Sequence, residues 1–372
     1  MERLAALWLL AGVAQSQVMI APGSEDERKA ERAIADFTAR PGGKIDCAIE
    51  KYPPRLGFSL RFWTGYDLIL PARQFAERGP VATLLRVTPK GGSPVYFYER
   101  ANLPPADPAK PLPKRADFSL RGGFLLGEGE YDLALYVVDA KNRVCRQSWK
   151  VEADAPKGQM RIEPGRVAES EIERWRGIPP KASTKRVSIF LHAAPVFPRR
   201  NVVRLSSLDI SVLTGSLTSL LDTSEFAQAR VTAFGLDGRD VIFESSDFDG
   251  RAYRRLVRTL IDLNLGTVSY GTLKGPGPLA LIETLARKES AQSERADAVV
   301  FLGATSRYSA KLPPLMKELR AQLPPAYFVT FRSPYQHPDD LIHRFVRDGG
   351  GKTYTIFSPG DLASAIREIS RN

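Results

Sequence analysis

The sequence predicts two domains, an all-β sandwich followed by an α/β domain with a mostly parallel sheet covered on both faces. Three observations support this fold class. A chain of 372 residues with 43% hydrophobic residues is long enough to form two cores. Residues 45–153 alternate apolar and polar side chains between turns rich in Gly, Pro and Asp, which is typical of short β-strands. Residues 186–372 instead alternate apolar strands with amphipathic helical segments.

Residues 1–16 have the pattern of a signal peptide. Arg3 precedes an apolar run at residues 4–14, and the small residues that lead up to Ser16 match a cleavage site. The alternative is a packed N-terminal helix, because Glu2 offsets the positive charge. The run is shorter than the ~20 residues of a membrane-spanning helix, and no later run reaches that length. We therefore expect an exported protein, periplasmic or secreted, with a soluble mature chain that starts near Gln17.

Two segments flank the predicted sandwich. Residues 17–44 are expected to form a helical lead-in, because Ser24 and the three acidic residues after it have the pattern of a helix N-cap and first turn. Residues 154–185 are rich in Pro, Lys, Glu and Arg. Their apolar residues follow neither the helical nor the strand period, so we expect a linker there, with one helical turn near residues 170–176.

The region 45–153 is predicted to be an immunoglobulin-like sandwich. The closing strand is expected at Val144–Val151, where alternation places Cys145 and Trp149 on the same, core-facing side. The other apolar alternating stretches are Leu56–Phe62, Val81–Val87, Val95–Tyr98 and Tyr131–Val138.

Only two cysteines occur, Cys47 and Cys145, one near each end of this β-rich region. In an oxidising compartment they are expected to form a disulfide, and the alternative is a pair of buried free thiols. Two cysteines and three scattered histidines cannot supply a four-ligand structural zinc site.

From residue 186 to residue 372 the chain is predicted to be a doubly wound α/β domain. Strands are expected at residues 186–192, 229–235, 240–244, 296–302, 326–331 and 353–357, and helices at 206–221, 249–263, 278–288, 311–323, 338–347 and 360–369. An Asp237-Gly238 turn joins the second and third strands as a hairpin.

This order of elements, with one early hairpin, resembles the Rossmann-like von Willebrand factor A domain. The segment Phe345–Tyr354, followed by Asp361-Leu362 and Ala365-Ile366, is similar to the last strand and helix of that fold. A leader, a sandwich and this domain together resemble the secreted VWFA-related proteins of some soil bacteria.

The resemblance also implies where a metal site would lie. Members that bind a divalent cation use a D-x-S-x-S motif after the first strand, a loop threonine and an aspartate after the fourth strand. Here those positions read His192-Ala193-Ala194-Pro195-Val196 and Gly303, and only Thr272 stands where the loop threonine is expected. Mg²⁺ and Ca²⁺ need several oxygen ligands, so we expect a degenerate site without metal and no cofactor.

Two groups of residues are candidates for a binding face. The first is the carboxyl end of the predicted sheet, at His192, Thr272 and Gly303, where open α/β sheets place their ligands; a packing role for His192 is the alternative. The second is a basic stripe at positions i, i+3, i+4 and i+7 of one helix, with Leu256, Val257, Leu260 and Ile261 expected on its buried side, and a merely solvated face is the alternative. The stripe consists of Arg251, Arg254, Arg255 and Arg258.

Composition and motifs favour a binding protein over an enzyme. The formal net charge of +11 favours acidic partners, whereas export and the lack of a nucleic-acid-binding motif exclude nucleic acid. No G-x-S-x-G motif or metalloprotease helix occurs. We expect an exported protein-binding or envelope-scaffold module whose partner is a protein or an anionic envelope component. The alternative is an envelope hydrolase with a site assembled from distant residues.

Overall fold

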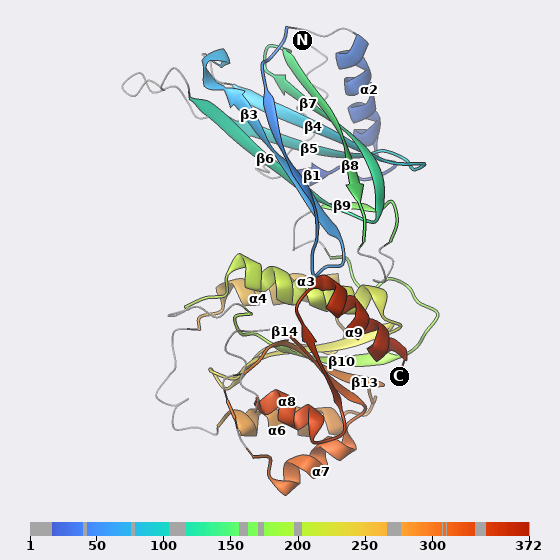
Figure 1. The fold of residues 1–372 in the computed structure, drawn as a ribbon, viewed down its shortest axis with the longest axis vertical. Helices are drawn as coiled ribbons and strands as arrows, with labels where there is room; N and C mark the ends of the chain where they lie inside the picture. The colour runs from blue at the N-terminus through green and yellow to red at the C-terminus, as the bar shows by residue number, and fades with distance from the viewer. Residues whose placement is uncertain are drawn as a thin grey trace. The chain divides into compact units, whose positions relative to one another are not determined.

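The protein is a mixed α/β chain whose described residues form three sheets, seen here in a computed structural model (Figure 1). It divides into two compact units, the second of which comprises Gly57–Leu60, Pro156–Met160 and Ile172–Asn372. The structure describes residues 17–39, 43–75, 79–103, 116–155, 163–169, 175–196, 203–265, 277–306, 308–309, 311–331 and 340–371.

Two antiparallel sheets build the first unit. One has the strand order β1-β5-β4-β7-β8 and the other β2-β3-β6-β9. The five-stranded sheet consists of β1 (Val18–Met19), β5 (Val95–Asn102), β4 (Pro80–Pro89), β7 (Gly129–Asp139) and β8 (Val144–Ala153). The four-stranded sheet consists of β2 (Ala48–Leu56), β3 (Phe62–Pro71), β6 (Asp117–Leu126) and β9 (Val167–Glu169). A short 3-10 turn, η1 (Ala72–Gln74), follows β3.

Both faces of the five-stranded sheet are covered. Its inner face contributes to a core shared with the other sheet, in which the rings of Phe97 on β5 and Phe124 on β6 lie 5.6 Å apart. Its outer face carries the helix α2 (Glu25–Ala39), whose Ala30 and Ile34 are buried against the sheet. The predicted lead-in helix is therefore part of this unit, and Ser24 caps it by accepting a hydrogen bond from the backbone N–H of Glu27 at 3.1 Å.

Three parts of the first unit differ from the prediction. The expected strand at Leu56–Phe62 is wrong: Leu56 and Phe62 are paired neighbours on β2 and β3, and the residues between them form a turn. Leu60 enters the left-handed region there, with φ of 51°. Strand β1 was not expected, and β9 pairs with β6 inside the predicted linker. Strands of two or three residues are too short to show a period.

The later part of the predicted linker packs as folded chain in the second unit. The indole N–H of Trp175 donates to Asp222 Oδ1 at 2.8 Å, and its ring packs beside Phe248 and Tyr253. The ammonium of Lys181 donates to the carbonyl of Leu221 in the last turn of a helix and to those of Ser224 and Phe226 just beyond its end. The helical turn expected near residues 170–176 lies largely outside the described residues.

One six-stranded sheet organises the second unit, with the order β12-β11-β10-β13-β14-β15. All neighbours are parallel except the β11–β12 hairpin. The strands are β10 (Arg186–His192), β11 (Gln228–Gly235), β12 (Asp240–Ser245), β13 (Ala298–Ala304), β14 (Ala326–Phe331) and β15 (Lys352–Ile356).

Helices cover both faces of this sheet (Figure 1). Three helices contribute apolar side chains to the core on one face of the sheet, and three others contribute to the core on the opposite face. The first face carries α3 (Ser207–Thr223), α4 (Gly250–Asp262) and α9 (Pro359–Arg371). The second carries α6 (Pro278–Ser290), α7 (Pro314–Gln322) and α8 (Leu341–Arg347).

None of the helices in the described part of the chain is both long and apolar enough to cross a membrane.

Candidate functional site

The carboxyl end of the parallel sheet brings His192 and Gly303 together. They lie at the carboxyl ends of the neighbouring strands β10 and β13 and are register partners. The His192 side chain is buried, its Nδ1 lies 2.8 Å from the carbonyl oxygen of Ala304, and its ring stacks on Phe234 with centroids 5.3 Å apart. Because a carbonyl can only accept, Nδ1 carries the proton in this contact. The imidazole therefore has a packing role at the carboxyl end of the sheet, where it contacts Phe234 and the carbonyl of Ala304.

The electrostatic surroundings of His192 act in opposite directions. Burial lowers the pKa of this histidine below its usual value, because a charged imidazolium is poorly solvated there. The carbonyl of Ala304 and the carboxylates of Asp340 and Asp237 favour the charged form but do not outweigh the burial. His192 is therefore a neutral side chain near neutral pH.

Gly303 lies at the position where the sequence resemblance places an aspartate in metal-binding domains, and its geometry excludes any side chain. Its φ is +145°, and an added Cβ would lie 2.5 Å from the carbonyl oxygen of His192. Real Cβ atoms do not approach backbone oxygens so closely. An oxygen ligand cannot extend from this position without moving β10 or β13.

Three aspartates near this end of the sheet hold loops in place. Asp209 accepts from the N–H of Val196 at 2.9 Å and forms a reciprocal capping box with Ser206 at the start of α3. Asp340 caps α8 by accepting from the N–H of His343 at 2.7 Å, and it also accepts from the N–H of Ser306. Asp237 accepts from the Tyr308 hydroxyl at 2.8 Å.

Sequence reasoning assigned Asp237 to a turn and did not single out Asp209 or Asp340. A local signal exists for both, since Asp209 stands three residues after Ser206 and Asp340 directly precedes an apolar helical stretch. These patterns indicate caps. Asp209 and Asp340 also contact Val196 and Ser306, respectively. These contacts join separate loops, so no pattern of neighbouring residues in the sequence predicts them.

No group of three or more His, Cys, Asp or Glu side chains is arranged to hold a metal ion within the described ranges. Thr272, the remaining candidate ligand, lies outside the described residues. The expectation that this end of the sheet binds neither Mg²⁺ nor Ca²⁺ therefore stays a prediction.

Helix α4 presents the predicted basic stripe to solvent. Its four arginines are all exposed, and we call them the arginine face: Arg251, Arg254, Arg255 and Arg258. On the opposite side, Leu256, Val257 and Leu260 are buried. The helix begins directly after its N-cap Asp249, whose Oδ1 accepts from the N–H groups of Arg251 and Ala252 at 3.0 and 2.8 Å.

The expected position of Ile261 is wrong. Its side chain is 44% exposed, because it lies three residues after Arg258 and shares the solvent side of the helix. The guanidinium of Arg255 lies 5.8 Å from the ring centroid of Phe243, which holds one edge of the arginine face against β12. Within the described chain, no ion pair joins any of the four arginines to a carboxylate.

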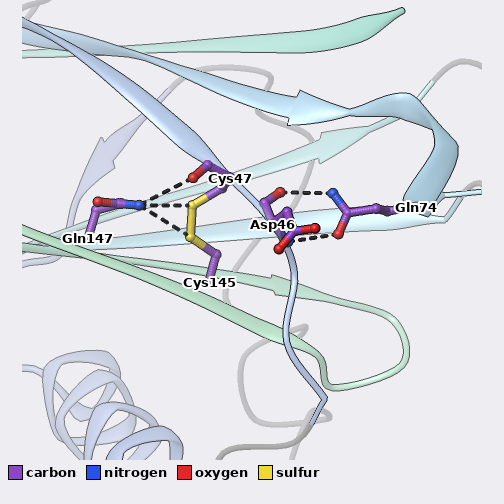
Figure 2. Close-up of a disulfide and its surroundings, with 5 residues drawn as sticks. All are labelled: Asp46, Cys47, Gln74, Cys145 and Gln147. Carbon is purple, nitrogen blue, oxygen red and sulfur yellow. Dashed lines mark hydrogen bonds between the residues drawn. A yellow bond between two sulfur atoms is a disulfide. The ribbon is translucent and has the colours of Figure 1, made fainter. Parts of the chain in front are cut away.

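The Cys47–Cys145 disulfide is confirmed (Figure 2). It ties the segment before β2 to strand β8, and therefore links the two sheets of the first unit. The side-chain amide of Gln147 donates to the carbonyl of Cys47 at 3.3 Å and faces both sulfur atoms. Cys145 is buried and Trp149 is half-buried on the same side of β8, as the alternation predicted. The disulfide therefore has a structural role, because it holds the two sheets of the first unit together.

Neither a protein-family model nor a curated protein matches the chain. Among solved structures, BatB from Bacteroides thetaiotaomicron is 14% identical, with a TM-score of 0.33, over 50% of this chain and 98% of that one. An aerotolerance-related membrane protein from Bacteroides fragilis NCTC 9343 is 13% identical, with a TM-score of 0.33, over 50% and 97%. A von Willebrand factor type A protein from Catenulispora acidiphila is 13% identical, with a TM-score of 0.29, over 66% and 46%.

Proposed function

We propose that the protein is an exported, non-catalytic binding module that docks an acidic segment of a partner protein on the arginine face of α4. The observation that carries the proposal is the arginine face itself, four exposed guanidinium groups on one side of a single helix, none of which forms an ion pair with a carboxylate in the described chain. The first unit would act as a rigid, disulfide-linked companion of immunoglobulin-like type.

The fold supports a von Willebrand factor A-like assignment for the second unit. Numbered within this unit alone, its strand order is 3-2-1-4-5-6, with one antiparallel edge strand and helices on both faces. That is an order of doubly wound α/β domains. The disulfide supports export, because such bonds persist in oxidising compartments and are rare in the cytosol.

The buried, hydrogen-bonded side chains at the carboxyl end of the sheet favour a binding surface elsewhere. His192, Asp209 and Asp340 are buried there, and each is hydrogen-bonded to the backbone of a neighbouring strand, loop or helix. Groups held in this way stabilise the loops and are not presented to a ligand. We propose on the same grounds that this end is a metal-free relic.

Arginine suits the proposed partner. A guanidinium can engage a carboxylate with two parallel hydrogen bonds, which a lysine ammonium cannot reproduce. The stripe covers seven residue steps, or about 10 Å of helix, which is close to the ~10–12 Å diameter of one partner helix. Exposed Asp249 and Asp262 stand at the two ends of α4 and would be repelled by a continuous anionic membrane. These features favour a narrow acidic polypeptide over a lipid surface.

The test is binding of the full chain to a labelled helical peptide with glutamates at i, i+3, i+4 and i+7. A peptide with glutamines at those positions and vesicles containing phosphatidylglycerol serve as the other two probes. We expect Arg254→Glu plus Arg258→Glu to weaken binding of the glutamate peptide about tenfold at low salt, equivalent to ~1.4 kcal/mol. Added salt should weaken wild-type binding, because exposed charges are screened within ~8–10 Å.

A matched control is Lys311→Glu plus Lys317→Glu, which changes the net charge equally at exposed positions outside α4. This control should leave binding of the glutamate peptide almost unchanged. The proposal fails if both double variants lose binding equally, if the glutamine peptide binds as well, or if only the vesicles bind.

A further inference from the structure

A cavity lined by charged, polar and apolar side chains opens in the second unit, away from both surfaces discussed above. It has a volume of about 100 Å³ and lies between β10, β11, β12 and the last two turns of α6. Ser188 and Arg230 are register partners on β10 and β11, and Thr232 and Glu244 are partners on β11 and β12. Register partners share a face of the sheet, so these side chains form one wall.

The cavity exists because small and polar residues occupy this end of the sheet face. Further along the same face, Phe190, Phe234 and Phe301 pack against α6 and its neighbours and fill the space. At the amino end of the parallel strands, Ser188 and Thr232 replace such rings. Phe190 and Leu285 still supply an apolar floor.

A buried pair of opposite charges lines this space. The side chains of Arg230 and Glu289 are only 11% and 6% exposed, and Arg230 Nη2 lies 3.6 Å from Glu289 Oε1. The hydroxyl of Ser188 donates to the same carboxylate oxygen at 2.8 Å. Arg230 Nη2 also donates to the carbonyl of Glu294 at 2.6 Å, whereas its buried Nε has no hydrogen-bond partner among the described residues.

A second pair of opposite charges lies nearer to solvent. Lys288 on α6 forms an ion pair with Glu244 on β12, and both side chains are about half exposed. The cavity therefore has a buried cation and anion and, beside them, an exposed cation and anion. A ligand that enters meets both signs of charge within one small space.

We propose that this cavity binds a small zwitterionic amino acid. The ligand's carboxylate would lie toward Arg230 and Lys288, and its ammonium toward Glu289 and Glu244. A simple anion would meet two carboxylates, and a simple cation would meet a guanidinium and an ammonium, so neither matches the pattern. The volume is below the ~300–1,000 Å³ of pockets for drug-sized ligands, which restricts the ligand to a short side chain.

Titration calorimetry of the full chain with glycine, L-alanine and L-serine tests the proposal. Acetate carries only the carboxylate of an amino acid and methylammonium only the ammonium group, and these two compounds are the comparison probes. We expect saturable binding of at least one amino acid, and affinity about tenfold or more lower for either half-ligand. The absence of saturable heat with all three amino acids, or equal affinity for acetate or methylammonium, would overturn it.

Variants locate the site. Glu289→Gln keeps an oxygen acceptor for Ser188 but removes the charge, and it should weaken binding about tenfold. Glu283→Gln is the control on the same helix, because that carboxylate pairs with Arg287 outside the cavity. Lys288→Met changes a half-exposed side chain outside the buried pair, so it tests the site even if Glu289→Gln does not fold, and it should also weaken binding. Affinity unchanged in Lys288→Met, or lowered equally in Glu283→Gln, contradicts the assignment.

Discussion

His192 shows how one buried titratable side chain links stability to pH. Its pKa is lowered in the folded protein from an ordinary 6.5, first by burial. The unfolded chain therefore binds a proton at higher pH than the folded chain does. As pH falls below about 6.5, the unfolded state is favoured, and this single group can remove up to about 2 kcal/mol of stability by pH 5.

We expect His192→Gln to lose less stability than the wild type between pH 7.5 and pH 5, measured by urea unfolding of the full chain. Glutamine keeps a donor for the carbonyl of Ala304 but does not titrate. His343→Gln, on α8, is the matched control for the loss of one imidazole, and His192→Gln should show the shallower pH dependence of the two. An identical pH dependence in wild type and His192→Gln would show that His192 is readily protonated in the folded state.

Glu99, on β5 in the first unit, has the opposite effect on how stability changes with pH. Its side chain is 8% exposed, and burial raises its pKa from 4.5 to about 7. The folded state thus binds a proton that the unfolded state has released between these values. Stability is lost as pH rises through this window, by up to about 3 kcal/mol.

The neutral variant Glu99→Gln should therefore be about 2–3 kcal/mol more stable than the wild type at pH 8 and nearly equal to it at pH 4.5. Calorimetric melting at the two pH values measures this difference. Glu50→Gln, at an exposed position on β2, controls for the loss of one charge. A Glu99→Gln protein that is less stable than the wild type at pH 8 would contradict the buried, protonated carboxyl.

At the scale of elements, the sequence predicted best those helices and strands in which the hydrophobic period extends over many residues or a capping residue marks the end. β10 has the predicted bounds of Arg186–His192, and α3 and α4 begin directly after Ser206 and Asp249, whose side chains cap them. The hydrophobic period and the cap are both local, so they can be read from adjacent residues. The arginine face followed from the same period.

Contacts that cross between elements could not be predicted in this way. Alternation at residues 56–62 is compatible with a strand, and only the pairing of Leu56 with Phe62 shows that the chain reverses there. The cavity pair Arg230 and Glu289 unites β11 with α6, which are far apart in the sequence. The rule that the carboxyl ends of parallel strands meet at one edge of the sheet did place His192 beside Gly303.

At the scale of the whole molecule, the disulfide and the surface charge both bear on the proposed function. The disulfide joins residues 98 positions apart within the first unit, so it constrains the unfolded chain strongly. The net charge of +11 gives the protein a general preference for acidic partners, and the arginine face concentrates part of that charge on one helix. The proposed function depends on this concentration, because diffuse charge alone would not select a partner.

Hydrogen–deuterium exchange of the full chain, with and without saturating glutamate peptide, tests the central claim most directly. Docking on the arginine face should stabilise α4 against local opening. We expect the peptide to slow exchange in residues 250–262, with no change at residues 192–196 or 303–306 at the carboxyl end of the sheet. Protection at the carboxyl end without protection of α4, or unchanged exchange of α4 at saturation, would contradict the account.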